Sequence, residues 1–256
     1  IAPWKTLRQH ADEILKDQRL RFIMDRYATY SGSDPRKAPA VLSTIAFVEE
    51  AFGAWHITGG VGQLSQAVYQ RCLDLGVVFE FDSPVAEINH NKGRATGVTM
   101  KDGRKIESSI VVANADASLV YNSLISGKVR KIKGARKRIA KSTQSLAGFS
   151  LLLGLRPDET STDLNHHTIL FPENYDAEFD AIFTTQTPVK DPTIYLCAPN
   201  DSAMVKELGA QSIYVLVNAP VHDANGKNGW NWNDPEFNRE YANSIIDQIE
   251  ARGISI

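Results

Sequence analysis

Apolar positions in the first 55 residues recur at the three- and four-residue spacing of amphipathic helices. The apolar residues that set this spacing are Trp4, Leu7, Ala11, Ile14 and the run Leu20 to Tyr27. Ser31 to Pro35 interrupts the pattern, because proline disfavours the helical conformation in the residue before it. Ala38 to Phe52 resumes it, so we expect a mainly helical N-terminal region.

The middle of the chain changes from a helical to a strand pattern. Gly59 to Gly62 precedes an amphipathic segment that Gly76 is placed to end in a left-handed conformation. Val77 to Asp82 then alternates apolar and polar side chains, which is typical of a strand. Three more strands are expected at Val85 to Ile88, Ala95 to Met100 and Ile110 to Asp116. Hairpin turns are expected at Asn91-Lys92-Gly93 and Asp102-Gly103.

The second half of the chain predicts another sheet. The expected strands are Leu146 to Leu155, Thr168 to Phe171, Ile194 to Ala198 and Ile213 to Ala219, and Glu236 to Arg252 has a helical pattern. The first and last of these strands carry apolar residues on both faces. We therefore expect both faces of this sheet to be covered, one by helices and the other by a cavity or by further parts of the protein.

Composition restricts the possible classes of function. The 256 residues have 43% hydrophobic and 23% charged side chains, which are ordinary values for a globular protein. The net charge of -2 argues against a dedicated nucleic-acid binder. Only Cys72 and Cys197 are present, which favours buried thiols over a disulfide. No apolar run reaches the roughly 18 residues that a membrane span needs. A cytoplasmic or peripheral membrane location is expected.

Several patches, taken in order, carry a family resemblance. An expected helix follows Gly59-Gly60-Val61-Gly62, and an expected hairpin follows Val85-Ala86-Glu87-Ile88. An expected strand ends with Val111-Val112-Ala113-Asn114-Ala115-Asp116. Similar patches occur at Tyr30 to Pro35, at Phe149 to Leu155 with His166-His167, at Asp191 to Tyr195 and at Tyr214 to Pro220. In this order the chain resembles the phytoene desaturase (carotenoid dehydrogenase) branch of the FAD-dependent amine-oxidase-like flavoproteins.

The resemblance implies an α/β fold of the FAD-linked-reductase type. Residues 1–58 would be a helical region of the substrate domain, residues 59–118 the C-terminal part of the FAD-binding domain, and residues 119–256 a substrate domain with a mixed sheet. The implied activity is desaturation of a polyisoprenoid, carotenoid-like substrate with FAD as hydride acceptor. The alternatives are an amine oxidase, a protoporphyrinogen-oxidase-like or retinol-saturase-like enzyme, or a non-catalytic isoprenoid carrier.

The strand–turn–helix that holds the FAD pyrophosphate in this family has no convincing copy here. Gly60-x-Gly62-x-x-Ser65, with Glu80 twenty residues after Gly60, comes near the G-x-G-x-x-G pattern. Ser65 replaces the third small residue, however, and a hairpin follows where a crossover helix is needed. The chain is therefore expected to be an internal fragment of a larger enzyme, and its own FAD binding is doubtful.

The resemblance also assigns possible cofactor contacts. The residue matching Val85 offers its backbone N–H and C=O groups to the adenine of FAD, and Gly59, Gly60, Asn114 and Asp116 would lie near the cofactor. Each has a simpler interpretation. Val85 would be an ordinary core valine, the glycines would allow a tight turn, and Asn114 and Asp116 would cap backbone groups.

A proton must leave the substrate carbon during desaturation, and Glu49, Glu50 and His56, just before Gly59, are the candidate acceptors. No metal site is expected. His166 and His167 are adjacent, and adjacent residues on a strand point to opposite faces, so a structural role is favoured for both.

Gly127 to Lys141 is strongly basic. Its cations are Lys128, Arg130, Lys131, Lys133, Arg136, Lys137, Arg138 and Lys141, without an acid among them. A solvated helical face explains this run, and attraction to an anionic membrane surface is the functional alternative. The expected partners are an apolar isoprenoid substrate, peripheral membrane contact through Lys128 to Lys141, and a second copy in a homo-oligomer. Nucleic acid is not expected.

Overall fold

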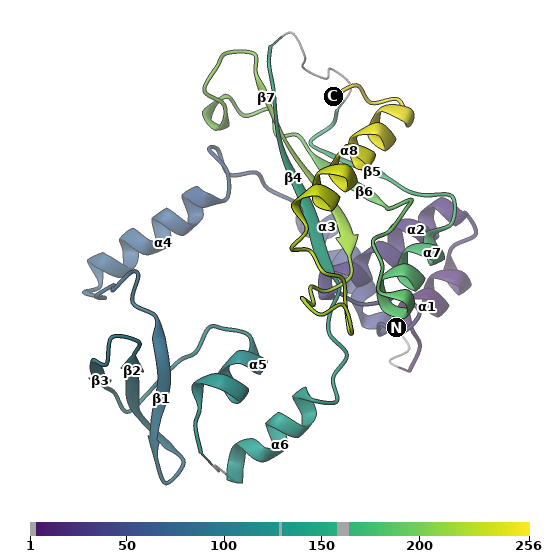
Figure 1. Ribbon diagram of the computed structural model, residues 1–256. Coiled ribbons are helices and arrows are strands. Elements are labelled where there is room, and N and C mark those ends of the chain that lie inside the picture. The colour runs from purple at the N-terminus through teal and green to yellow at the C-terminus, as the bar shows by residue number, and fades with distance from the viewer. Residues whose placement is uncertain (1–3, 128–129, 158–163) are drawn as a thin grey trace. The chain divides into compact units, whose positions relative to one another are not determined.

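The computed structural model describes residues 4–127, 130–157 and 164–256 (Figure 1). Contacts divide the chain into two compact units. The first unit joins Ile1–Val68 to Ser145–Ile256, and the second is Tyr69–Gln144. The helical N-terminal region thus packs in one unit with the C-terminal sheet. The assignment of the chain to substrate and cofactor domains stays a prediction. It divides the chain into residues 1–58, 59–118 and 119–256.

The N-terminal half of the first unit is helical, as its pattern predicts. It contains α1 (Leu7–Ile14), α2 (Gln18–Arg26), the 3-10 helices η1 (Tyr27–Ser31) and η2 (Ala40–Leu42), and α3 (Ser43–Phe52). Thr6 and Gln9 form a capping box at the start of α1, and the Asp17 carboxylate accepts a hydrogen bond from the Arg19 backbone at the start of α2. Leu7, Ala28 and Ala38 form a small buried cluster between these helices.

The sheet of the first unit has four strands in the order β4-β7-β6-β5. They are β4 (Ala147–Leu155), β5 (His167–Leu170), β6 (Ile194–Cys197) and β7 (Gln211–Ala219). The α/β class is confirmed, and each expected strand of this sheet is present. The expectation of a mixed sheet is corrected, because all described pairings in it are antiparallel. The connections between β5, β6 and β7 each return the chain in the opposite direction, so adjacent strands alternate.

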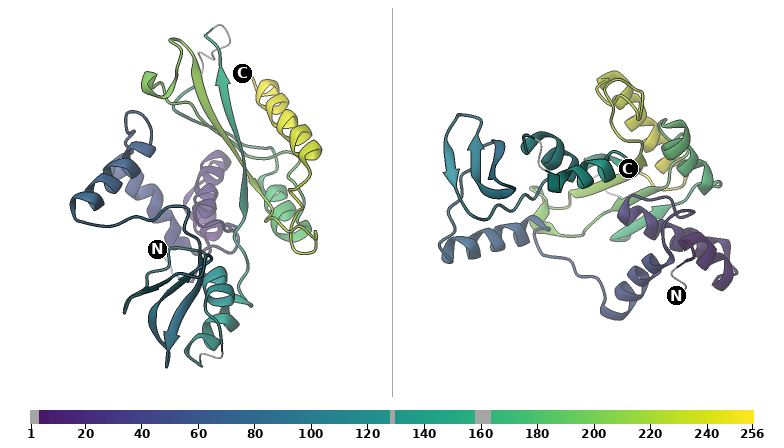
Figure 2. Two further views of the ribbon diagram at one scale, coloured as in Figure 1. Left: turned by 60° about the vertical axis from the view of Figure 1, so that its left-hand side comes forward. Right: turned by 90° about the horizontal axis from the view of Figure 1, so that it is seen from below.

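One face of this sheet is covered by α8 (Pro235–Ala251). In both views of Figure 2 the sheet lies between α8 on one side and the N-terminal helices on the other. Ile245 and Ile249 of α8 are fully buried against alternate residues of β6 and β7. The sheet residues of this buried cluster are Ile194, Leu196, Ile213, Val215 and Val217. This apolar contact is the main core of the unit.

The other face of the sheet carries the alternate side chains, including Tyr195, Ile169 and Leu216. Leu152 of β4 is on this face and is 84% exposed. The apolar residues on the two faces therefore differ in burial. Those on one face are buried by α8, and those on the other face are partly exposed. This agrees with the expectation of one face covered by helices and one left for a cavity.

A buried carboxylate connects the sheet to α7 (Tyr175–Asp180). Glu178 is completely buried, and burial raises the pKa of its carboxyl group. Its oxygens accept hydrogen bonds from the Thr193 backbone N–H at 2.6 Å and from Asn218 Nδ2 at 2.7 Å. These two hydrogen bonds thus join α7 to the segment before β6 and to β7. A π-helix, η4 (Ala181–Thr185), follows α7.

The second unit holds a three-stranded antiparallel sheet in the order β1-β2-β3. Its strands are β1 (Val85–Asn91), β2 (Arg94–Met100) and β3 (Lys105–Glu107). The preceding helix α4 (Gly62–Asp74) ends before Gly76, which has the positive φ of 81° expected for a terminating glycine. The remaining elements are α5 (Ala117–Leu119), the π-helix η3 (Val120–Leu124) and α6 (Arg130–Ile139).

Two expected strands are absent from the described structure. Val77 to Asp82 pairs with no strand, and Asp82 adopts a φ of 51°, which is not a strand conformation. Phe79 and Phe81 instead contact the Tyr69 ring. Ile110 to Asp116 is also unpaired, with Ile110 and Val112 largely exposed. A strand needs a neighbour to satisfy its backbone, and the described residues place none beside these segments. Among the described helices, none is long and apolar enough to cross a membrane.

Candidate functional site

The open face of the four-stranded sheet forms one wall of a cavity of about 940 Å³. Helices α2, η1 and α3 supply residues to the opposite wall. Apolar and aromatic side chains predominate in it, including Ile23, Tyr30, Ile169, Tyr195 and Leu216. A volume of this size is typical of small-molecule sites, and such a lining suits an apolar ligand.

A small polar group stands in this largely apolar wall. The Glu49 carboxylate of α3 accepts hydrogen bonds from the hydroxyls of Tyr27 at 2.7 Å and Tyr30 at 3.1 Å. Burial, and then the Glu49 charge, raise the pKa of both tyrosines, so both hydroxyls stay protonated and keep donating. The two hydrogen bonds hold the Glu49 carboxylate in place at the cavity wall.

The three candidate proton acceptors lie in different places. Glu49 lines the cavity, whereas Glu50 is exposed on α3 and does not line it. His56 also lies outside the lining, and its Nε2 is 2.9 Å from Asp201 Oδ2. The His56 ring meets the His166 ring edge-on, with centroids 5.1 Å apart. Only Glu49 therefore has the position that a proton acceptor for a ligand in this cavity needs.

Gly59 and Gly60 form a tight turn in the first unit. Their φ angles are 80° and 86°, which side chains with a Cβ rarely adopt. The Gly59 backbone N–H donates to Asp201 Oδ2 at 2.7 Å, and a Cβ on Gly60 would be 3.3 Å from Met204 Cε. His56 first, and then the Gly59 backbone, lower the pKa of Asp201. Sequence reasoning missed Asp201, because 142 residues separate it from Gly59.

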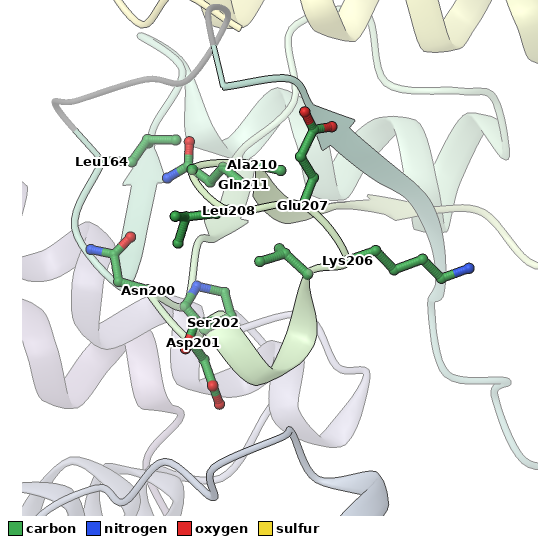
Figure 3. Close-up of a pocket in the computed structure, with 12 residues that line it drawn as sticks. Leu164, Asn200, Asp201, Ser202, Lys206, Glu207, Leu208, Ala210 and Gln211 are labelled. Carbon is green, nitrogen blue, oxygen red and sulfur yellow. The ribbon is translucent and has the colours of Figure 1, made fainter.

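Asp201 also borders a second hollow of about 650 Å³, formed by the loop between β6 and β7 (Figure 3). In Figure 3 the Asp201 side chain extends away from this hollow. The lining mixes polar loop residues, such as Asn200 and Lys206, with Leu208, which is almost fully exposed. The hollow contains none of the sequence-predicted candidates, and the cavity on the open face of the sheet is the better site.

The remaining cofactor candidates, Val85, Asn114 and Asp116, lie in the second unit. Val85 begins β1, which is an edge strand of its described sheet and pairs on one side only, with β2. Asp116 is the N-cap of α5 and accepts a hydrogen bond from the Ser118 backbone at 2.8 Å. Asn114 is exposed and belongs to no helix or strand.

The fit of these residues to FAD is partial. An edge strand leaves alternate backbone groups available, which suits the adenine contact expected of Val85. The sequence, however, supplies no G-x-G-x-x-G turn for the pyrophosphate.

His166 and His167 are closer together than a shared strand would allow. Strand β5 begins at His167, so the alternation of faces does not extend to His166. The two imidazole centroids are 4.4 Å apart, and His167 pairs across the ladder with Cys197. The argument that these two histidines must point apart is therefore wrong.

Comparison with known proteins places the chain in a family. No family model matches it. A 1-hydroxycarotenoid 3,4-desaturase from Flavobacterium sp. (strain P99-3) is 33% identical over 215 residues, covering 84% of this chain and 41% of the relative. A zeta-carotene-forming phytoene desaturase from Myxococcus xanthus is 34% identical over 217 residues, covering 83% of this chain and 40% of the relative. The chain thus spans about two fifths of the length of these curated relatives.

Among solved structures, an oxidoreductase from Methanosarcina mazei matches 96% of this chain and 51% of its own chain with a TM-score of 0.61. Its sequence identity is 13%, so this likeness concerns the fold alone. The family assignment rests on the sequence matches to carotenoid desaturases, which extend over more than four fifths of the chain. The chain belongs to the phytoene desaturase (carotenoid dehydrogenase) family.

Proposed function

We propose that this chain forms the substrate-binding part of an FAD-dependent carotenoid desaturase. The desaturase names of its relatives support this reaction class. In the proposed reaction two hydrogens leave adjacent carbons of an apolar polyisoprenoid, one as a hydride and one as a proton, and a carbon–carbon double bond forms. Bound FAD supplies the hydride acceptor.

The observation that carries the proposal is the cavity on the open face of the four-stranded sheet. Its wall combines apolar side chains of β5 and β7 with tyrosines of η1. A long hydrocarbon offers no hydrogen bonds, so its recognition depends on apolar area removed from water. An open, largely apolar groove beside a helix-covered core fits that requirement better than a polar metabolite site.

Within this cavity we assign the proton-accepting role to Glu49. Its carboxylate is the candidate that lines the cavity, and the Tyr27 and Tyr30 hydroxyls orient it. A general base must reach the proton that it removes, directly or through one water. Glu50 and His56 lie outside the lining and are not assigned this role.

Cofactor binding is proposed to need more than this chain. Val85 would contact the adenine, and neither the Gly59-Gly60 turn nor Asn114 and Asp116 replaces a pyrophosphate cradle. An adenine contact alone does not offset the entropy lost on binding. Titration of the purified chain with FAD should therefore give a Kd weaker than about 1 μM. Submicromolar binding would contradict this assignment.

Substrate binding is tested on the purified chain with a carotenoid polyene delivered in detergent micelles. Ile169→Glu places a carboxylate in the cavity wall, and Ile14→Glu adds the same charge at an exposed position on α1. We expect at least a tenfold weaker polyene affinity for Ile169→Glu, equivalent to about 1.4 kcal/mol, and little change for Ile14→Glu. Equal effects of the two variants would remove the cavity as the binding site.

The role of Glu49 is tested in the longer protein that carries this chain, with its flavin bound. Glu49→Gln should lower kcat far more than it changes KM, by about 10²-fold or more, because general bases contribute about that much. Glu50→Gln, one residue further along α3, is the matched control and should leave kcat unchanged. Equal losses would reject Glu49 as the base. A longer protein that binds polyene but holds no flavin would favour an isoprenoid carrier.

A further inference from the structure

We propose that His166, His167 and Cys197 form a binding site for one Zn²⁺ ion at the wall of the cavity. Their potential ligand atoms all lie within 4.8 Å of one another. Two imidazole nitrogens and a thiolate are a donor set that Zn²⁺ binds well in proteins. The site goes beyond the proposed desaturase function and does not depend on it.

The sheet brings the three donors together. His167 of β5 and Cys197 of β6 are directly paired in the antiparallel register, and directly paired residues point to the same face of a sheet. His166 precedes β5, and its carbonyl oxygen accepts a hydrogen bond from the Ala198 N–H at 3.0 Å. That bond fixes the backbone of His166 next to Cys197. Two of the donors thus come from adjacent strands that the ladder already holds, and the third comes from the residue just before β5.

Tyr195 supplies the supporting contact that metal-binding histidines usually have. Its hydroxyl oxygen is 2.7 Å from His167 Nδ1. When Nδ1–H donates to this oxygen, the lone pair of His167 is on Nε2 and is available to the metal.

Neighbouring groups leave the site open on one side. His56, held by Asp201, contacts the His166 ring edge-on and restricts its orientation. His167 and Tyr195 both line the cavity, so the fourth position of a tetrahedral ion would be open to water or to an oxygen of a ligand. Of the nearby charged groups, the Arg26 guanidinium lies over the Tyr195 ring, 5.5 Å from its centroid, and the Glu49 carboxylate lines the same cavity as His167.

The distances require a small closure on binding. Ligand atoms around a tetrahedral Zn²⁺ are about 3.3 to 3.7 Å apart, given Zn–N and Zn–S bonds of about 2.1 and 2.3 Å. The ligand atoms, which lie within 4.8 Å of one another, therefore have to approach by about 1.5 Å at most. Side-chain rotations of His166 and of the exposed His167 can bring their nitrogens nearer to Cys197 without movement of the strands.

Cobalt is the probe, because Co²⁺ bound by a thiolate gives a charge-transfer absorption band and tetrahedral Co²⁺ gives intense visible bands. The purified, reduced, metal-free chain is titrated with Co²⁺ alone. We expect both kinds of band to saturate at one equivalent and to disappear when one equivalent of Zn²⁺ is added. No saturable thiolate band, or saturation at several equivalents, would overturn the proposal.

The two cysteines provide a matched pair of variants. Cys197→Ser should abolish the charge-transfer band, while Cys72→Ser, which changes the other thiol on α4, should keep it. His167→Ala should weaken Co²⁺ binding at least tenfold, whereas His10→Ala on α1 should not weaken it. Circular dichroism checks that each variant is folded, and His167→Ala serves as the test if Cys197→Ser is not. Loss of the band in Cys72→Ser, or its retention in both Cys197→Ser and His167→Ala, would show chance binding and reject the site.

Discussion

The two faces of the four-stranded sheet use the same strands for different purposes. The face under α8 is closed by fully buried aliphatic side chains such as Ile245 and Val215. The opposite face forms one wall of the cavity. Tyrosines, a glutamate and a histidine also line this cavity, and Ile169 of the sheet is partly exposed in it. Because side chains alternate along a strand, each residue serves one face only. Stability and binding can therefore be changed separately in this sheet.

The helices beyond the cavity differ from α8 in how they are held. Arg8 of α1 contacts Asp25 of α2 and Asp176 of α7, each at 2.7 Å. Arg36 similarly joins Asp34 and Asp180, each at 2.9 Å. The packing of α8 thus depends on apolar burial, whereas the helices beyond the cavity are also held by ion pairs. The first should be insensitive to pH, and the second should respond to it.

The largest effect is expected from one substitution made on each face. Ile245→Ala removes a fully buried side chain and should destabilise the chain by about 2 to 5 kcal/mol. Ile169→Ala removes the same atoms from a side chain that is 37% exposed and should cost less, because less apolar area is buried there. Urea denaturation of both variants measures the difference. Equal losses would mean that the open face contributes to stability as much as the α8 face.

A smaller effect is expected from Asp25, whose side chain is almost fully buried. Oδ2 accepts a hydrogen bond from Arg8, whereas Oδ1 is buried without a described partner. Burial, opposed by Arg8, raises the pKa of Asp25 from 3.8 to about 6. Between these values the unfolded state is ionised and the folded state is still protonated. The stabilising contribution is thus complete below pH about 4 and is lost as the pH rises through about 6.

Asp25→Asn removes this titration. The stability of the unsubstituted chain relative to Asp25→Asn should fall by the order of 1 kcal/mol between pH 4 and pH 7.5. Urea denaturation over this range gives the difference. Asp180→Asn, at the exposed end of the Arg36 ion pair, is the control and should not reproduce this fall. A difference between the unsubstituted chain and Asp25→Asn that does not change with pH would show that Asp25 is already ionised when buried.

A third test concerns membrane binding by the basic helix α6 in the second unit, and it separates attraction by charge from apolar attraction. Lys128 lies outside the described residues. Arg136 donates to the carbonyls of Tyr121 and Ile125, each at 2.6 Å, so it has a structural role. Lys133, Lys137 and Arg138 are exposed. Replacing these three by Gln should weaken binding to anionic vesicles by about 1 kcal/mol per cation at low salt.

Vesicle sedimentation at low and high salt distinguishes the two attractions. The loss caused by the three substitutions should vanish at high salt, because screening removes attraction by exposed charges. Any binding left at high salt is expected to depend on the open apolar face, and so to fall in Ile169→Glu. Unchanged binding of the triple variant at low salt would show that α6 is an ordinary solvated face.

The sequence predicted those parts of the fold whose pattern is local. Helix α8 and strands β4 and β7 follow from periodicity, and Gly76 ends α4 because only glycine adopts its conformation easily. Val77 to Asp82 and Ile110 to Asp116 also have strand patterns but lack a described partner. A pattern shows which side chains suit a strand, while pairing depends on a neighbour that the pattern does not include.

The candidate site was predictable to a lesser degree. Glu49 could be named from its place before Gly59, yet its contacts with Tyr27 and Tyr30 depend on how α3 packs on η1. Asp201 gave no signal, because its partners are brought together only by the fold. His166 was misjudged because both histidines were treated as strand residues, whereas β5 begins at His167, so the alternation of faces does not apply to His166.

The buried carboxylate of Glu178 has a further consequence, for how the chain avoids wrong pairings. A slip of β7 by one residue would turn Asn218 to the opposite face and leave Glu178 without one of its two donors. The apolar residues of β7 would tolerate the slip more easily, since valine and leucine occupy both faces. A buried carboxyl group that loses a hydrogen-bond donor costs on the order of 1 to 3 kcal/mol. The hydrogen bond from Asn218 to Glu178 therefore favours the native register of β7 over a slip by one residue.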